Sequence, residues 1–108
     1  MSITAVKFDL INKANTNKIF EDVRKELKKA KSKFPYWPND PLHASGIVSE
    51  EVGELHKEVL QWMYEPHKTE YENIRKEAIQ SLAMLVRFID SLDTNKYEWL
   101  KSDQHEQL

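Results

Sequence analysis

Only two glycines, Gly46 and Gly53, occur among the 108 residues of this chain. Sheet proteins need many tight turns, and glycine is one of the residues that most often makes them. The scarcity of glycine therefore predicts an all-α fold. The two glycines lie seven residues apart on an expected helix, where each costs about 1 kcal/mol relative to alanine. Close approach of a neighbouring helix or of a ligand would explain them.

Three stretches carry apolar residues at helical spacing, and we expect helices at about residues 17–34, 41–64 and 70–92, with a short further helix at residues 96–101. Each long stretch begins with residues typical of a helix start: Thr16 or Asn17, then Asp40 followed by Pro41, and last a capping box of Thr69 and Glu72. The chain is therefore expected to form an antiparallel bundle of three to five helices.

The third long helix has two apolar stripes. One consists of Tyr71, Ile74, Ala78, Leu82, Leu85, Ile89 and Leu92, and the other of Ile79, Ala83 and Val86. A helix that is apolar on more than one side is buried on more than one side. In a single domain covering residues 1–108, we expect the second side to be a subunit interface. The helix around residues 70–92 would then assemble a homodimer or homotetramer.

The composition excludes several classes of protein. The net charge is −2, and no stretch approaches the roughly 18 consecutive apolar residues of a membrane span, so we expect neither a membrane protein nor a nucleic-acid-binding protein. The absence of cysteine removes disulfides, thiolate metal sites and cysteine nucleophiles. Residues 1–10 lack the basic and apolar regions of a signal peptide, and a cytoplasmic location is expected.

Four carboxylates, Glu50, Glu51, Glu54 and Glu58, fall within nine residues of the second expected helix. Residues three and four apart are neighbours on a helix, so Glu51, Glu54 and Glu58 form one stripe in which like charges repel. A divalent cation with oxygen ligands would remove this repulsion. The alternative is an acidic face exposed to solvent. Glu58 has no evident partner and is expected to be a surface residue.

Glu77 and Gln80 form a second polar pair, three residues apart on the third expected helix. A short connection makes the second and third helices antiparallel neighbours. Glu54 precedes Pro66 by twelve residues and Glu77 follows it by eleven, so the two pairs lie at nearly the same height along the bundle. Glu51, Glu54, Glu77 and Gln80 are therefore candidate ligands of Mg²⁺, with Mn²⁺ as an alternative.

Other chemistries lack their motifs. No Glu precedes a His by three residues, as in di-iron carboxylate bundles, and the four histidines show no zinc-ligand spacing. The chain has neither the nucleophile elbow of a serine hydrolase nor a glycine-rich phosphate loop. The two polar pairs remain the leading candidate site.

An aromatic, proline-rich segment at residues 34–41 separates the first two expected helices. Its aromatic side chains either close the end of the bundle or stack on a base, where stacking contributes about 1–3 kcal/mol per base in nucleic-acid binders. Tyr36 and Trp37 are the candidates for stacking within this segment. The basic run at residues 24–33 is either a solvated face or a surface that attracts phosphate.

These motifs resemble those of the all-α nucleoside triphosphate pyrophosphohydrolases of the MazG-like type, whose signature is Glu-Glu-x-x-Glu on one helix and Glu-x-x-Asp on the next. Residues 50–54 (Glu-Glu-Val-Gly-Glu) match the first half, and residues 77–80 (Glu-Ala-Ile-Gln) match the second except at Gln80. Residues 37–44 (Trp-Pro-Asn-Asp-Pro-Leu-His-Ala) look like the same segment of small, often phage- or prophage-type members. The resemblance covers roughly residues 34–92.

The resemblance implies Mg²⁺-dependent hydrolysis of a nucleoside triphosphate, often a deoxynucleotide, to the monophosphate and pyrophosphate by a dimer or tetramer. The residue roles that it implies are metal ligation by Glu51, Glu54, Glu77 and Gln80, and ligation or water orientation by Glu50. It also implies phosphate binding by Lys57, Lys76 or a lysine of the first helix, and base stacking by Trp37, Tyr36 or Trp62. Gln80 replaces a carboxylate by an amide, so metal affinity is expected to be lower. The alternatives are a nucleotide-binding module without catalysis, and a structural bundle whose basic first helix contacts a protein or nucleic acid.

Overall fold

A computed structural model describes residues 12–94 of the chain. They form three α-helices, α1 (Lys13–Lys33), α2 (Pro41–Tyr64) and α3 (Tyr71–Thr94), and a single 3₁₀ turn, η1 (Pro66–Lys68). The expected all-α fold is confirmed, since these residues contain no strand. The helix expected at residues 96–101 lies outside the described part. None of the helices in residues 12–94 is both long and apolar enough to span a membrane.

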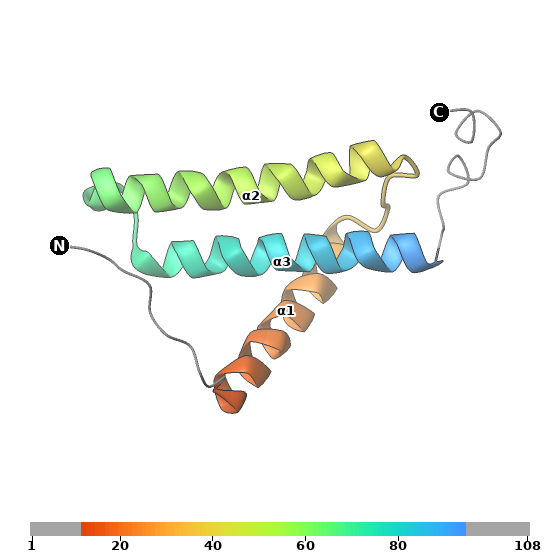
Figure 1. Cartoon of the computed structure of the whole chain (residues 1–108), viewed down its shortest axis with the longest axis horizontal. Coiled ribbons are helices and arrows are strands. Elements are labelled where there is room, and N and C mark those ends of the chain that lie inside the picture. Colours follow the sequence, from red (N-terminus) through yellow and green to blue (C-terminus); the bar gives the residue numbers. More distant parts are fainter. Residues whose placement is uncertain (1–11, 95–108) are drawn as a thin grey trace.

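Two of the helices, α2 and α3, lie side by side and antiparallel, while α1 crosses α3 at a steep angle (Figure 1). Packing joins α2 to α3 and α1 to α3, whereas α1 and α2 make no direct helix–helix packing in the described chain. The arrangement is therefore a layer of two antiparallel helices with α1 across one side of it. Among the described apolar residues, only Val23, Ala44 and Ala83 are fully buried.

The second helix begins and ends where its sequence signals predict. The Asp40 carboxylate accepts a hydrogen bond from the Leu42 backbone N–H at 2.9 Å, and Pro41 is the first helical residue. Tyr64 is the last, two residues before Pro66, as a proline that cannot continue a helix requires.

The expected start of the first helix, at Thr16 or Asn17, is wrong. The helix begins one turn earlier, because the Asn12 side chain accepts a hydrogen bond from the Asn15 backbone N–H at 3.0 Å. The Thr16 N–H already donates to the Asn12 carbonyl within the first turn. Asparagine is among the most favourable N-cap residues and is more favourable than threonine, so the helix begins at the earlier cap.

The capping box expected at Thr69 is also not formed. The Thr69 hydroxyl instead donates to the Glu58 carboxylate at 2.5 Å and accepts from the Asn73 side-chain amide at 3.1 Å. Glu58 was expected to be a surface residue without a partner, and this expectation is wrong as well. Its hydrogen bond with Thr69 ties the end of α2 to the start of α3 across η1.

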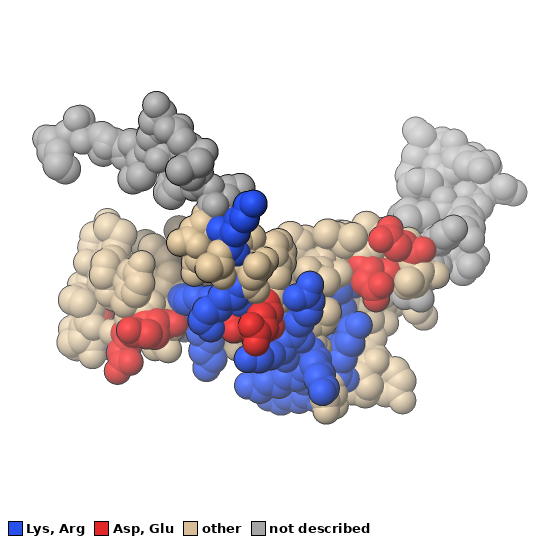
Figure 2. Space-filling model, turned by 90° about the horizontal axis from the view of Figure 1, so that it is seen from below, with Lys and Arg blue, Asp and Glu red and all other residues tan. Residues whose placement is uncertain are grey.

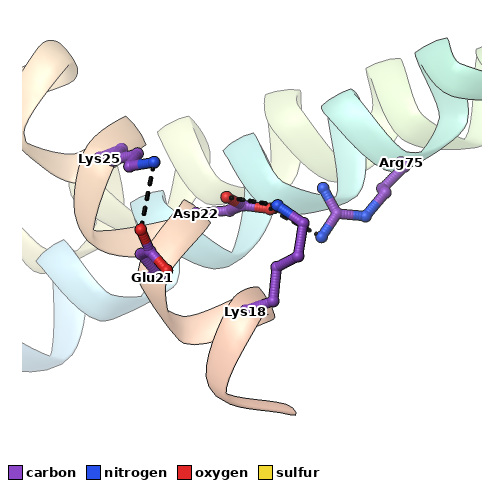
Figure 3. A network of polar contacts seen from close by, with 5 residues as sticks. All are labelled: Lys18, Glu21, Asp22, Lys25 and Arg75. Atoms are coloured by element: carbon purple, nitrogen blue, oxygen red, sulfur yellow. Dashed lines mark hydrogen bonds and ion pairs between the residues drawn. The ribbon is translucent and has the colours of Figure 1, made fainter. Parts of the chain in front are cut away.

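A polar cluster holds α1 against α3 (Figure 3). The Asp22 carboxylate on α1 accepts a hydrogen bond from the Arg75 guanidinium on α3 at 2.8 Å, and Lys18 approaches the same carboxylate at 3.4 Å. The hydrogen bond from Arg75 is the main cause of a lowered pKa at Asp22. This contact joins α1 to α3 beside the α2–α3 layer.

Gly46 and Gly53 do not have the role expected of them within the chain. Both lie on the exposed surface of α2, and a Cβ atom added at either position would meet no atom within 4 Å. No described helix approaches them closely enough to require a glycine.

Candidate functional site

Two adjoining hollows lie where α1 and the segment 34–40 meet the α2–α3 layer. The charged hollow has a volume of about 350 Å³ and is lined by Glu26, Lys29, Ala30, Lys33, Phe34, Glu51, Lys76, Gln80 and Met84. The aromatic hollow, of about 530 Å³, is lined by Ala30, Phe34, Tyr36, Trp37, Pro38, His43, Ile47, Glu50, Glu51, Met84 and Arg87. Glu51 is the one carboxylate that belongs to both linings. It therefore stands at the boundary between a polar and an apolar compartment.

The charged hollow combines groups from all three helices. Glu51 on α2 and Gln80 on α3, one from each predicted pair, line it together with Glu26 and lysines of α1. On the side of the molecule where α1 lies, Lys and Arg side chains form a large basic patch, with acidic side chains among them (Figure 2). An anion that enters the hollow would meet lysine ammonium groups and, next to them, carboxylates that attract a cation.

Burial and the charges of neighbouring carboxylates raise the pKa values of Glu51 and Glu77. Desolvation is the largest cause at Glu51, followed by the charges of Glu77, Glu54, Glu26 and Glu50. At Glu77 desolvation is again the largest cause, followed by Glu54 and Glu58, while Lys76 acts in the opposite direction. The two predicted pairs are thus near enough to interact across the α2–α3 packing, and Glu26 joins them from α1.

The donor groups suit a hard divalent cation, because carboxylate and amide oxygens are the protein ligands that Mg²⁺ prefers. Glu51 and Glu54 on α2, with Glu77 and Gln80 on α3, are the residues that would hold it. Within residues 12–94, however, no three His, Asp or Glu side chains lie close enough together to form a metal-binding group. The ligand chemistry fits, and the side chains would have to turn towards one another to coordinate an ion.

The remaining predicted residues fall into two groups. Lys76 lines the charged hollow, and Glu50, Tyr36 and Trp37 line the aromatic hollow, so the site contains them. Glu54 and Lys57 are exposed and line neither hollow. The charge of Glu54 nevertheless acts on Glu51 and Glu77. Trp62 lies at the far end of α2, where its ring packs edge-on against Tyr71 at 5.3 Å. The structure does not bring Trp62 together with Trp37.

Arg87 holds the wall of the aromatic hollow in place. Its guanidinium donates to the carbonyl oxygens of Phe34, at 2.5 Å, and Tyr36, at 3.3 Å, and lies 5.0 Å from the centre of the Trp37 ring. The side chain is only 6% exposed, and its burial lowers the pKa of the guanidinium. Arg87 thereby fixes the segment that joins α1 to α2.

Sequence reasoning missed two of these residues, although each had a signal. Arg87 is the only charged residue between Ala78 and Ile89, and a lone charge in an apolar stretch needs a buried partner. Glu26 is the only acidic residue in the basic run 24–33. Neither signal identifies the partner, because the crossing of α1 over α3 is not encoded in local spacing.

Comparisons of this chain with protein-family models, with curated proteins and with solved structures give no match.

Proposed function

We propose that the protein hydrolyses a nucleoside triphosphate, or its deoxy form, to the monophosphate and pyrophosphate with Mg²⁺ as cofactor. The observation that carries this proposal is the position of Glu51 in both hollows. A nucleotide has an anionic chain at one end and a flat apolar base at the other, and the two hollows offer one compartment for each. The MazG-like spacing of the two polar pairs supports the same substrate class.

Each part of the nucleotide has groups to receive it. Lys29, Lys33 and Lys76 line the charged hollow, where their ammonium groups would pair with phosphate oxygens. Tyr36 and Trp37 in the aromatic hollow would stack on the base, which is favourable for any base because every base has a π face. Burial of the base beside Glu51 would place the phosphorus nearest the sugar at the boundary between the hollows.

The reaction needs a water molecule, a proton acceptor and charge neutralisation. In the proposed step, the water oxygen bonds to the α-phosphorus while the bond from that phosphorus to the bridging oxygen breaks, which releases pyrophosphate. Glu50, beside Glu51 in the aromatic hollow, would orient the water and accept its proton. Bound Mg²⁺ would neutralise the triphosphate and lower the pKa of bound water. Lysines of the charged hollow would stabilise the leaving pyrophosphate.

A nucleotide-binding module without catalysis is the second candidate. It is favoured by Gln80, which supplies no charge, and by the absence of a grouped carboxylate site in residues 12–94. A panel of nucleoside and deoxynucleoside triphosphates, with and without Mg²⁺, separates the two. Stabilisation by a nucleotide together with pyrophosphate release supports the enzyme, and stabilisation without release supports the binding module. If no nucleotide stabilises the protein and none is hydrolysed, both candidate functions are contradicted.

We further propose that the working form is a homodimer or homotetramer, as the resemblance implies, in which α3 takes part in assembly.

A further inference from the structure

Arg87 is a buried cation whose charge is not neutralised by any carboxylate in the described part of the chain. The residue is only 6% exposed. The ion pairs within residues 12–94 join other side chains, and none of them includes Arg87. Its neighbours, two carbonyl oxygens and the Trp37 ring, supply only partial negative charge. A buried charge without a charged partner is unfavourable, so the guanidinium needs an anion from another source.

The hydrogen bonds of Arg87 leave one part of its guanidinium without an acceptor. Arginine has five N–H donors, which belong to Nε, Nη1 and Nη2. Nη2 donates to the carbonyl oxygens of Phe34 and Tyr36. Among residues 12–94, no oxygen accepts a hydrogen bond from Nε or Nη1 of this side chain. Neighbouring N–H groups of a guanidinium form a fork that binds two oxygens of one carboxylate or phosphate.

A third hollow lies against Arg87 and is distinct from the charged and aromatic hollows. Its volume is about 300 Å³, and its lining consists of Lys31, Pro35, Trp37, Arg87, Asp90, Ser91 and Thr94. Trp37 and Arg87 also line the aromatic hollow, so the two hollows share a wall. Lys31 lines neither of the other hollows. The third hollow therefore brings a second cation to Arg87, and this cation has no place in the candidate site described above.

The groups of the third hollow favour an anion. Lys31 and Arg87 supply two positive charges, whereas Asp90 supplies one negative charge and forms an ion pair with neither of them. The hydroxyl groups of Ser91 and Thr94 already donate to backbone carbonyl oxygens of α3, at 2.6 and 2.7 Å. The donors that remain for a ligand are thus the two cations.

The size of the hollow and the number of donors narrow the class of anion. Ligand pockets commonly range from about 300 to 1,000 Å³, and a hollow at the lower end of this range suits a small ligand. A carboxylate has two oxygens, and the fork of Arg87 would occupy both of them. A phosphate has further oxygens that the ammonium group of Lys31 can bind. The arrangement therefore suits a phosphate group better than a carboxylate.

We propose that the third hollow is a binding site for a small phosphate-type oxyanion, held by Nε and Nη1 of Arg87 and by the ammonium group of Lys31. The anion would neutralise the buried guanidinium while Nη2 keeps its two carbonyl oxygens. Either a free phosphate ion or a small phosphate monoester has this chemistry. The site shares no lysine with the charged hollow, so the inference holds whether or not the protein hydrolyses nucleotides.

Calorimetric titration of the full chain with inorganic phosphate, at constant ionic strength set by sodium chloride, tests the proposal. We expect the wild type to bind phosphate and Lys31→Gln to bind it about tenfold more weakly or worse. Lys29→Gln is the matched control, because it removes the same charge from α1 but lines the charged hollow. No binding by the wild type, or a loss in Lys29→Gln as large as that in Lys31→Gln, would overturn the proposal.

A variant that gains affinity covers the case in which loss of a cation disturbs the fold. Asp90→Asn removes the negative charge from the third hollow, and we expect it to bind phosphate about threefold more tightly or better. Unchanged or weaker binding by Asp90→Asn would contradict the site. Glycerol phosphate, titrated in parallel, distinguishes the two sources of the anion. Tighter binding than that of phosphate assigns the site to a monoester, and weaker binding assigns it to the free ion.

Discussion

The guanidinium of Arg87 lies 5.0 Å from the centre of the Trp37 ring and donates a hydrogen bond of 2.5 Å to the Phe34 carbonyl oxygen. This relationship connects the middle of α3 to the segment that lines the aromatic hollow. A cation over an aromatic face is attracted by the ring quadrupole, most strongly over tryptophan. The position of Trp37, and with it the shape of the hollow, therefore depends on a residue of another helix.

Replacing this arginine is expected to be costly. Arg87→Met removes the donor to two carbonyl oxygens and the cation over Trp37, which we expect to lower the free energy of unfolding by about 2–4 kcal/mol. Arg75→Met on the same helix breaks only an exposed ion pair with Asp22, and we expect it to lower the free energy of unfolding by clearly less. Urea unfolding of both variants measures the difference. Equal losses of unfolding free energy in the two variants would show that Arg87 does not stabilise the fold more than an exposed ion pair does.

The aromatic hollow makes a prediction about substrate binding. Trp37→Ala should raise the KM for a nucleoside triphosphate by about 5- to 150-fold, which corresponds to the loss of one base-stacking contact of about 1–3 kcal/mol. Trp62→Ala is the control, because Trp62 packs on Tyr71 at the far end of α2. Steady-state kinetics of both variants provide the measurement. A larger effect at Trp62 than at Trp37 would place the base elsewhere.

The raised pKa values of Glu51 and Glu77 predict how stability depends on pH without metal. Above the ordinary value of 4.5, the folded protein holds more protons on these groups than the unfolded chain does. Their contribution to stability therefore falls as the pH rises through the raised pKa values, and it is regained on acidification. In Glu77→Gln this dependence should be flatter, whereas Glu72→Gln, an exposed acid of α3, should behave like the wild type.

Urea unfolding midpoints measured between pH 4.5 and neutrality, in the presence of a chelator, test this expectation. Identical slopes in the wild type and Glu77→Gln would contradict it. Adding Mg²⁺ at neutral pH should restore stability to the wild type, because a ligand that binds only the folded state stabilises it.

Gln80 offers a substitution in the opposite direction. Gln80→Asp adds the missing carboxylate to the second pair, and we expect it to bind Mg²⁺ about tenfold more tightly. Without Mg²⁺ the same variant should be less stable than the wild type, because it adds a like charge to the cluster. Gln80→Leu removes the oxygen and should weaken Mg²⁺ binding. Thermal unfolding over a range of Mg²⁺ concentrations distinguishes the three proteins, and three identical responses would exclude Gln80 from the cation site.

Local signals predicted the helices better than they predicted the site. Asp40 with Pro41, and Pro66, defined α2 to the residue, because caps and prolines act on their own neighbours. The sequence-based prediction missed the first turn of α1, because Asn12 caps the helix one turn before Thr16. The matching heights of Glu54 and Glu77 followed from a short connection between two helices. After desolvation, the charge of Glu54 is the next largest cause of the raised pKa of Glu77, which agrees with these heights.

What sequence could not supply was the third helix of the site. Glu26 and the lysines of α1 reach the charged hollow only because α1 crosses α3, held there by Asp22 and Arg75. The crossing depends on contacts between residues more than fifty positions apart, and no periodicity within α1 indicates them. Periodicity within α2 also does not indicate the hydrogen bond of Glu58, because its partner Thr69 lies on the other side of the connection to α3.

Pyrophosphate release from nucleoside triphosphates by the wild type, Glu51→Gln and Glu72→Gln is the most direct test of the proposed function. Glu51 belongs to both hollows, while Glu72 is exposed and lines neither. We predict Mg²⁺-dependent release by the wild type and by Glu72→Gln, and a loss of at least about a hundredfold in Glu51→Gln. No release by the wild type with any nucleotide, or full activity in Glu51→Gln, would contradict the proposed function.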